Sequence, residues 1–272
     1  MTLTIGILEC GENRAEWLAE HGHFADWFKP FLSNAASVPL QYRTFKVHAD
    51  QLPESVDDAD AWLITGSPAS VYEHPSWQAA LTDFLLEAVV EKPIIGICYG
   101  HQLMHQIMGG SVEEVEQWGI GVHEYDVVHT PTWVAENDKL SSLRILASHQ
   151  DQVTSAAPNT KILVSSKFCP IAVSLIGNKV LTMQAHPELT PELARVVYAF
   201  RREIQGDELT DRAIDSTSNE IDADVFGRWI IQFVNHVNEC PSDLKKRTDF
   251  NTIDTVEKNP TDVQHILSLI HI

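Results

Sequence analysis

The first 110 residues alternate between apolar runs and amphipathic segments. The apolar runs are short and rich in β-branched residues, which predicts buried strands at 3–10, 40–47, 59–67 and 92–98. The other segments repeat apolar residues at helical spacing, which predicts helices at 15–32, 77–92 and 101–110. Strands and helices in alternation predict a parallel sheet with helices on both of its faces.

From residue 112 to 181 the strand signals follow one another without helices between them. The predicted strands lie at 122–129, 143–147, 161–166, 171–177 and 179–184. Strands joined in this way favour antiparallel pairing, and two amphipathic helices follow, at 191–204 and 223–237. We therefore predict an α/β fold: a mostly parallel central sheet with helices on both faces and an antiparallel extension, as in flavodoxin-like proteins.

One domain is expected over residues 1–240. Residues 241–266 lose their periodicity, which predicts a loose C-terminal tail. The last six residues, 267–272, read as codons CTG-TCT-CTT-ATA-CAC-ATC, equal the translated mosaic-end adapter of transposon-made sequencing libraries. We expect these six residues to be sequencing-adapter read-through in place of the natural C-terminus, with an ordinary apolar tail as the alternative.

Charge narrows the classes of partner. The 272 residues have a formal net charge of −19, from 38 acidic and 19 basic side chains. Such a surface repels phosphate backbones and anionic membranes, so we expect no nucleic acid and no membrane as partner. Four scattered cysteines without a CxxC pair, and the lack of a basic or long apolar N-terminal segment, favour a cytoplasmic protein. A small polar substrate or a protein partner suits this composition.

The strongest chemical signal lies between the predicted strand at 92–98 and the helix that follows it. Gly96-Ile97-Cys98-Tyr99-Gly100 has the form of a nucleophile elbow, in which glycines flank a residue held on a sharp strand-to-helix turn. The turn places the Cys98 thiol at a helix N-terminus, which favours the thiolate, and it directs the Tyr99 backbone N–H toward a developing oxyanion. The alternative is a buried structural cysteine.

A base for this nucleophile is expected at His186. It follows the predicted strand at 179–184, and Glu188 lies two residues further on. A carboxylate that close can bind one imidazole nitrogen and fix the tautomer of the ring. Alone, His-Pro-Glu is a weak signal, but together with the elbow it predicts a cysteine–histidine–carboxylate triad.

Two polar segments complete the predicted site. Gly66 ends the strand at 59–67 and can turn a backbone N–H into the cleft as a second oxyanion donor; an ordinary turn is the alternative. The segment 148–153 is predicted to be a polar loop after the strand at 143–147, which either binds an amino-acid substrate or is a surface turn. His101 and His105 have i, i+4 spacing but no evident third ligand, so we expect no metal and no cofactor.

At this point the chain resembles a known family. The motifs at 96–102 (Gly-Ile-Cys-Tyr-Gly-His-Gln), 148–151 (Ser-His-Gln-Asp) and 184–188 (Gln-Ala-His-Pro-Glu) occur in the order and spacing of class I glutamine amidotransferases. Over roughly 1–240 the chain is similar to the amidotransferase domain of GMP synthase and its free-standing bacterial relatives. The segment 117–121 also resembles plant γ-glutamyl peptidases, and its Trp118 is expected to line the cleft.

The resemblance implies roles for particular residues. It implies a triad of Cys98, His186 and Glu188 and an oxyanion hole from the backbones of Gly66 and Tyr99. It also implies a glutamine pocket, formed by Gln102, Ser148, His149, Gln150 and Asp151. Two departures bear on the pocket: Gly66 lies in Thr-Gly-Ser-Pro where GMP synthase has a Gly-Gly-Pro type loop, and Gln150 stands where Gly is usual.

Three functions remain open at this level. The first is hydrolysis of the γ-amide of glutamine or a γ-glutamyl compound through a Cys98 thioester, with a possible separate synthetase subunit that uses the ammonia. The second is a γ-glutamyl peptidase that needs no synthetase. The 272 residues contain neither a Ser-Gly-Gly-x-Asp-Ser pyrophosphatase loop nor a P-loop, and this absence is an argument for the second function. The third is a non-catalytic regulator on the same fold.

Overall fold

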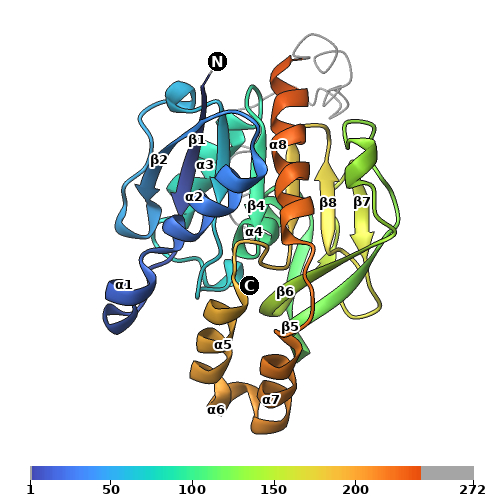
Figure 1. The fold of residues 1–272 in the computed structure, drawn as a ribbon. Coiled ribbons are helices and arrows are strands. Elements are labelled where there is room, and N and C mark those ends of the chain that lie inside the picture. Colours follow the sequence, from blue (N-terminus) through green and yellow to red (C-terminus); the bar gives the residue numbers. More distant parts are fainter. Residues whose placement is uncertain (1, 240–272) are drawn as a thin grey trace. The chain divides into compact units, whose positions relative to one another are not determined.

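A nine-stranded sheet organises residues 2–239, the part of the chain that the computed structural model describes (Figure 1). The strand order is β2-β1-β3-β4-β9-β8-β7-β5-β6. The strands are β1 (Leu3–Glu9), β2 (Leu40–Lys46), β3 (Ala61–Ile64), β4 (Ile94–Ile97), β5 (Ser111–Val127), β6 (Ser142–Ser155), β7 (Thr160–Ser165), β8 (Val173–Ile176) and β9 (Val180–Met183).

Neighbouring strands run parallel from β2 through β1, β3 and β4 to β9. Every residue of β3, β4 and β9 is buried, because helices cover both faces of this part of the sheet. That burial explains why these strands are continuous apolar runs in the sequence. Their carboxyl ends share one edge of the sheet, and residues that follow the three strands therefore come together there.

The remaining strands pair antiparallel, from β9 through β8, β7 and β5 to β6. The longest ladder joins β5 and β6, from Ser111 opposite Ser155 to Asp126 opposite Ser142, and its register shifts between Glu114 and Gly119. The predicted α/β fold, with its parallel sheet and antiparallel extension, is confirmed.

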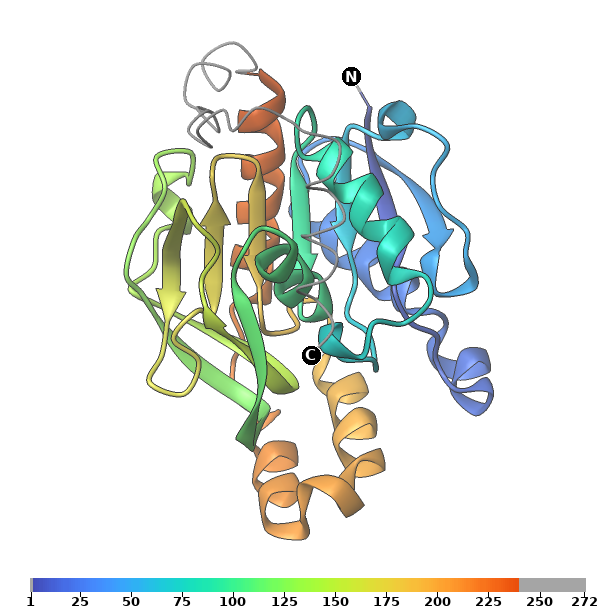
Figure 2. The ribbon, with the colours of Figure 1, turned by 180° about the vertical axis from the view of Figure 1, so that it is seen from behind.

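Helices cover both faces of the sheet. Helices α2 and α8 lie on the face seen in Figure 1, and α3 and α4 lie on the face seen in Figure 2. On the first face, Gly227 allows close packing, since a Cβ there would lie 3.0 Å from the Cβ of Ala35. The helices are α1 (Ala15–His21), α2 (Phe24–Ala35), α3 (Gln78–Ala88), α4 (Tyr99–Ile107), α5 (Pro191–Phe200), α6 (Arg202–Gln205), α7 (Asp207–Ser216) and α8 (Ala223–Glu239), with short 3-10 turns at Val47–Ala49, Val56–Asp58, Val71–Glu73 and Glu136–Asp138.

Two predicted helices differ from the observed ones. The segment 15–32 forms two helices, because Gly22 adopts a φ of 69° and ends α1 before α2 begins. The segment 191–204 breaks at Arg201, whose φ and ψ of −88° and 7° are no longer helical. Helix α7, which packs beside α5 and β5, was not predicted.

The prediction of a polar loop at 148–153 is wrong. These residues continue β6 and pair with β5, with His149 opposite Gly119 and Asp151 opposite Glu114. Polar side chains do not end the strand here, because β6 is the last strand of the sheet and several of them line a cleft instead of the core. Trp118 belongs to β5.

The predicted tail at 241–266 and the predicted read-through at 267–272 lie outside the described residues. Within residues 2–239, no helix combines the length and apolar character that a bilayer-crossing segment requires.

Candidate active site

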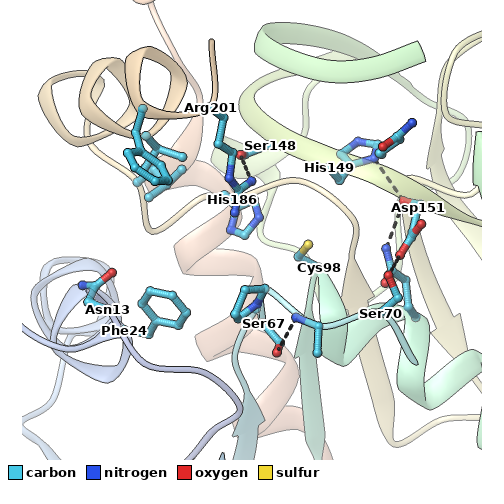
Figure 3. A pocket seen from close by; sticks show the side chains of 18 of the residues that line it. Asn13, Phe24, Ser67, Ser70, Cys98, Ser148, His149, Asp151, His186 and Arg201 are labelled. Atoms are coloured by element: carbon cyan, nitrogen blue, oxygen red, sulfur yellow. Dashed lines mark hydrogen bonds between the residues drawn. The ribbon is translucent and has the colours of Figure 1, made fainter. Parts of the chain in front are cut away.

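A cleft of about 470 Å³ opens at the carboxyl ends of the parallel strands. Gly66 follows β3, Cys98 follows β4 and His186 follows β9, and these three strands are neighbours in the sheet. All three residues line the cleft, and Figure 3 shows Cys98 and His186 within it. Open α/β sheets bind ligands at this edge, so the strand order itself brings the predicted nucleophile, base and oxyanion donor together.

Cys98 occupies the sharp turn that the sequence predicts. Its φ of 52° and ψ of −99° lie in a region that L-residues rarely adopt, and its N–H donates to the Met183 carbonyl at 2.8 Å. The glycines make this turn possible: a Cβ on Gly96 would lie 2.5 Å from the Gly100 carbonyl oxygen, and one on Gly100 would lie 2.7 Å from Ile64. The thiol is free, only 8% of the residue is exposed, and it stands at the N-terminus of α4.

The two predicted oxyanion donors flank Cys98. Gly66 lies directly across from it, since a Cβ on Gly66 would be 3.7 Å from the Cβ of Cys98 and 3.0 Å from His186 Cε1. Tyr99 is the first residue of α4, where backbone N–H groups have no acceptor within the helix. Its side chain points into the core and donates to Gln78 Oε1 at 3.0 Å, so Tyr99 presents only its backbone to the site.

The loop that carries Gly66 is held from behind by the segment after β1. The Cys10 N–H donates to Thr65 Oγ1 at 3.0 Å, and Ser67 Oγ donates to the Cys10 carbonyl at 2.7 Å. The Cys10 thiol itself is buried, and burial raises its pKa well above the ordinary range. Cys10 therefore borders the site through its backbone while its thiol belongs to the core.

His186 and Glu188 form a buried pair. Nδ1 of the His186 ring lies 2.7 Å from Oε1 of Glu188, and the backbone N–H of His186 donates to the Leu146 carbonyl at 2.8 Å. Burial alone lowers the pKa of His186, but the charge of Glu188 and the interaction with Cys98 outweigh burial and raise this pKa to about 10. The imidazole is therefore held in its protonated form at neutral pH.

The residues predicted to bind the substrate all line the cleft. Gln102 donates through Nε2 to the Asp151 carbonyl at 2.9 Å and to Gln184 Oε1 at 3.2 Å. The Asp151 carboxylate accepts hydrogen bonds from the Ser70 and Tyr72 hydroxyls. Because both donors are neutral, the negative charge of Asp151 remains at the wall of the cleft.

His149 and Gln150 form the neighbouring wall on β6. His149 is 4% exposed, and burial together with nearby His123 and His186 lowers its pKa to about 3, so its ring is neutral. A Cβ on Gly119 would lie 2.9 Å from its Nε2. Gln150 donates across the ladder to the Val115 carbonyl at 3.2 Å. These contacts fix the shape of the wall.

Comparison with known families gives the site its context. The family model described as "Glutamine amidotransferase class-I" matches residues 31–205, more than half of the chain and both predicted catalytic motifs. This chain belongs to the class I glutamine amidotransferase family. It is similar to "Gamma-glutamyl peptidase 3" of Arabidopsis thaliana, with 27% identity over 184 residues that cover 62% of this chain and 72% of that protein.

Other members of the family match over different lengths. A GMP synthase [glutamine-hydrolyzing] of Aromatoleum aromaticum is 34% identical over 135 residues, which cover 47% of this chain but only 25% of the synthase. A glutamine amidotransferase of Thermotoga maritima has the same fold, with a TM-score of 0.66 and 15% identity over 87% of this chain and 98% of that one.

Arg201, a charged residue of the amidotransferase cleft, was not predicted from the sequence. Arg201 ends α5 and donates through Nη1 to Ser148 Oγ at 3.1 Å, with its guanidinium 5.9 Å from the centre of a Trp118 ring. Burial lowers its pKa. No local motif marks Arg201, because it reaches the cleft only through the packing of α5 against β6.

An aromatic wall was also missed. Trp17 and Trp27 lie within the segment predicted as one helix at 15–32, and both line the cleft, together with Phe24 and Phe200. Trp118 does line the cleft, as predicted. The helical spacing identified which residues share a face, but it gave no information on whether that face meets the core or a cavity.

His101 and His105 lie behind the cleft. His101 Nδ1 is 2.8 Å from Thr182 Oγ1, and His105 Nε2 is 2.8 Å from Ser174 Oγ. Throughout residues 2–239, no three or more His, Cys, Asp or Glu side chains are grouped in a way that would hold a metal ion.

Proposed function

We propose that this amidotransferase hydrolyses the γ-amide of glutamine or of a γ-glutamyl compound, with Cys98 as nucleophile, His186 as acid and base, and Glu188 as its orienting carboxylate. Membership in the family supports amide hydrolysis of this class. The observation that carries the assignment is the strained Cys98 elbow, which faces Gly66 and the His186–Glu188 pair across the same cleft.

The proposed reaction has two acyl-transfer steps. The Cys98 thiolate attacks the γ-carbonyl carbon, and the backbone N–H groups of Gly66 and Tyr99 stabilise the oxyanion, each donor contributing about 2.7–4 kcal/mol. Protonated His186 gives its proton to the departing nitrogen, which leaves a γ-glutamyl thioester. His186, now neutral, takes a proton from water, and the resulting hydroxide releases glutamate.

Two opposite charges suit the α-amino and α-carboxylate groups of the substrate. Arg201, at Ser148, would receive the carboxylate, and Asp151 would attract the ammonium. Replacing Arg201 by Met keeps an apolar stem over Trp118 but removes the charge. A charged hydrogen bond contributes about 1.5–3 kcal/mol, so the KM for glutamine is expected to rise about ten- to a hundredfold, with a smaller change in kcat.

Steady-state kinetics of glutamate release measures this effect. Arg202→Met is the matched control, because Arg202 is the next residue but bonds to Asp207 and Asp211 outside the cleft. An unchanged KM in Arg201→Met would remove Arg201 from substrate binding.

The cleft bears on the two catalytic alternatives. A glutaminase subunit that supplies a separate synthetase releases only ammonia, whereas a γ-glutamyl peptidase must hold the amine of its substrate. The cleft extends well beyond Cys98 and His186 to the aromatic wall, which favours the second alternative. The name of the Arabidopsis relative agrees with it.

The proposal is tested by measuring glutamate release from glutamine and from γ-glutamyl dipeptides with the purified full chain. We expect glutamate from both classes without any added synthetase. Labelling of Cys98 by a γ-glutamyl chloromethyl ketone analogue separates an active site from a non-catalytic regulator. If the chain shows no turnover and Cys98 is not labelled, the proposed function is contradicted.

A further inference from the structure

The cleft continues past His186 into an apolar arm that the hydrolysis of glutamine does not need. We call this region the leaving-group arm, and it is lined by Trp17, Phe24, Trp27, Phe28, Phe200 and Ile204. We infer that the arm binds the departing amine, and that the preferred substrates are γ-glutamyl amides whose amine carries an aromatic or branched aliphatic group. This inference rests on the proposed function of Cys98 and His186.

The position of the arm relative to the triad gives it this role. In Figure 3, His149, Asp151 and Ser70 lie to one side of Cys98, and Phe24 lies on the other side, beyond His186. The Asp151 side suits the α-ammonium group of the substrate, and Arg201, which Figure 3 shows above His186, suits its α-carboxylate. The departing nitrogen must face the group that protonates it, so the amine leaves on the side of His186, where the arm begins.

The apolar surface of the arm is open to a ligand. Phe200 is 46% exposed at the end of α5, and Ile204 is 66% exposed on α6. Large apolar side chains gathered around a cavity indicate a ligand-binding groove. The cleft volume of about 470 Å³ is within the range of sites that enclose whole small molecules. Ammonia would leave this surface uncovered, whereas an aromatic or branched amine would cover it.

Contacts between the aromatic rings hold the arm in shape. Trp17 meets Phe200 edge-on with ring centres 5.0 Å apart, and the Arg14 guanidinium lies 4.2 Å from the centre of the Phe200 ring. Phe24 packs on Trp27 at 4.9 Å. The first two contacts join α1 and the residue before it to the end of α5, and the third fixes two rings of α2 against each other.

Gly11 sets the distance between the arm and the oxyanion loop. A Cβ on Gly11 would lie 2.6 Å from Pro68 Cδ and 2.8 Å from Phe24 Cε2. The absence of a side chain at Gly11 therefore allows the Phe24 ring to lie beside the loop that carries Gly66. An amine bound against Phe24 is thus next to the carbonyl that Cys98 attacks.

The chemistry balances without a further reactant. Attack by the Cys98 thiolate forms the C–S bond, and the C–N bond then breaks as the amine departs with the proton of His186. Water, which gives a proton back to His186, cleaves the thioester to glutamate and restores the thiolate. What the arm adds is binding of the amine's side chain while the C–N bond breaks, an effect that appears in kcat/KM.

The test compares kcat/KM for three substrates by one common product, glutamate: glutamine, γ-glutamyl-glycine and γ-glutamyl-phenylalanine. We expect γ-glutamyl-phenylalanine to exceed γ-glutamyl-glycine by about tenfold or more, the discrimination typical of a filled apolar pocket. In Phe24→Ala and Phe200→Ala this ratio is expected to fall toward one. Phe24→Leu retains apolar bulk and should give an intermediate ratio.

Leu86→Ala is the matched control, since Leu86 is 45% exposed, close to the 46% of Phe200, but lies on α3 outside the cleft. Its substrate ratio should equal that of the unmodified chain. If glutamine is hydrolysed but the two dipeptides react equally, or if the arm variants keep the ratio, the inference is wrong and the proposed function stands. If none of the three compounds yields glutamate, the proposed function fails as well.

Discussion

Replacing Cys98 by Ala is expected to lower glutamate release by about 10⁴-fold or more. The substitution removes the only atom that can carry the acyl group, and the loss of a triad nucleophile typically has an effect of this size or larger. The strained backbone around Cys98 is supported by Gly96, Gly100 and the hydrogen bond to Met183, none of which involves the thiol. The fold and its thermal midpoint should therefore change little.

Cys98→Ser makes the same test more stringent. It retains a small polar side chain, but its hydroxyl is a far weaker acid than a thiol, and it should also be nearly inactive. Cys169→Ala is the matched control, because Cys169 is another buried free cysteine and does not line the cleft. Substantial turnover by Cys98→Ala, or an equal loss in Cys169→Ala, would contradict the assigned nucleophile.

Replacing Glu188 by Gln is expected to lower kcat by about 10²- to 10⁴-fold and to change its pH dependence. Against the effect of burial, Glu188 and Cys98 together raise the pKa of His186 from an ordinary 6.5 to about 10, so the imidazolium is lost as the pH rises toward that value, and Glu188 supplies part of this shift. Oε2 of Glu188 is buried and accepts no hydrogen bond from the described residues, which leaves its charge to act on His186.

The sign of the pH effect follows from the proton that His186 gives to the amine. Without the carboxylate charge the pKa of His186 falls and the imidazolium is lost at lower pH. The alkaline limb of the kcat/KM profile therefore moves to lower pH. A charged hydrogen bond of about 1.5–3 kcal/mol corresponds to about one to two pH units. Glu192→Gln, an exposed substitution on α5, should leave the limb in place. An unmoved limb in Glu188→Gln would exclude Glu188 from this role.

The sequence predicted the features that depend on local chemistry. The strand-to-helix turn at Cys98 is marked by Gly96 and Gly100, which the crowded elbow requires. The His186–Glu188 contact joins residues two positions apart, so both partners lie in one short motif that can be recognised in the sequence. The parallel strands were predictable because helices bury both faces and leave uninterrupted apolar runs.

What the sequence did not reveal depends on packing between distant segments. Segment 148–153 is polar yet extended, because β5 supplies its hydrogen-bonding partner and several of its polar side chains line the cleft. Arg201 reaches Ser148 across 53 positions of the chain. Trp17 and Phe200 meet only because α1 and α5 converge at the cleft. An apolar helical face looks the same in the sequence whether it covers a core or lines a cavity.

Hydrolysis of the γ-amide is proposed to proceed through a γ-glutamyl thioester on Cys98. The most direct measurement is mass spectrometry of the full chain, acid-quenched during turnover of a γ-glutamyl substrate and digested to peptides. The predicted result is one γ-glutamyl group on the peptide that contains Cys98, absent from Cys98→Ala. Turnover with no acyl group on Cys98, or with the acyl group on Cys10 or Cys169 instead, would contradict the account.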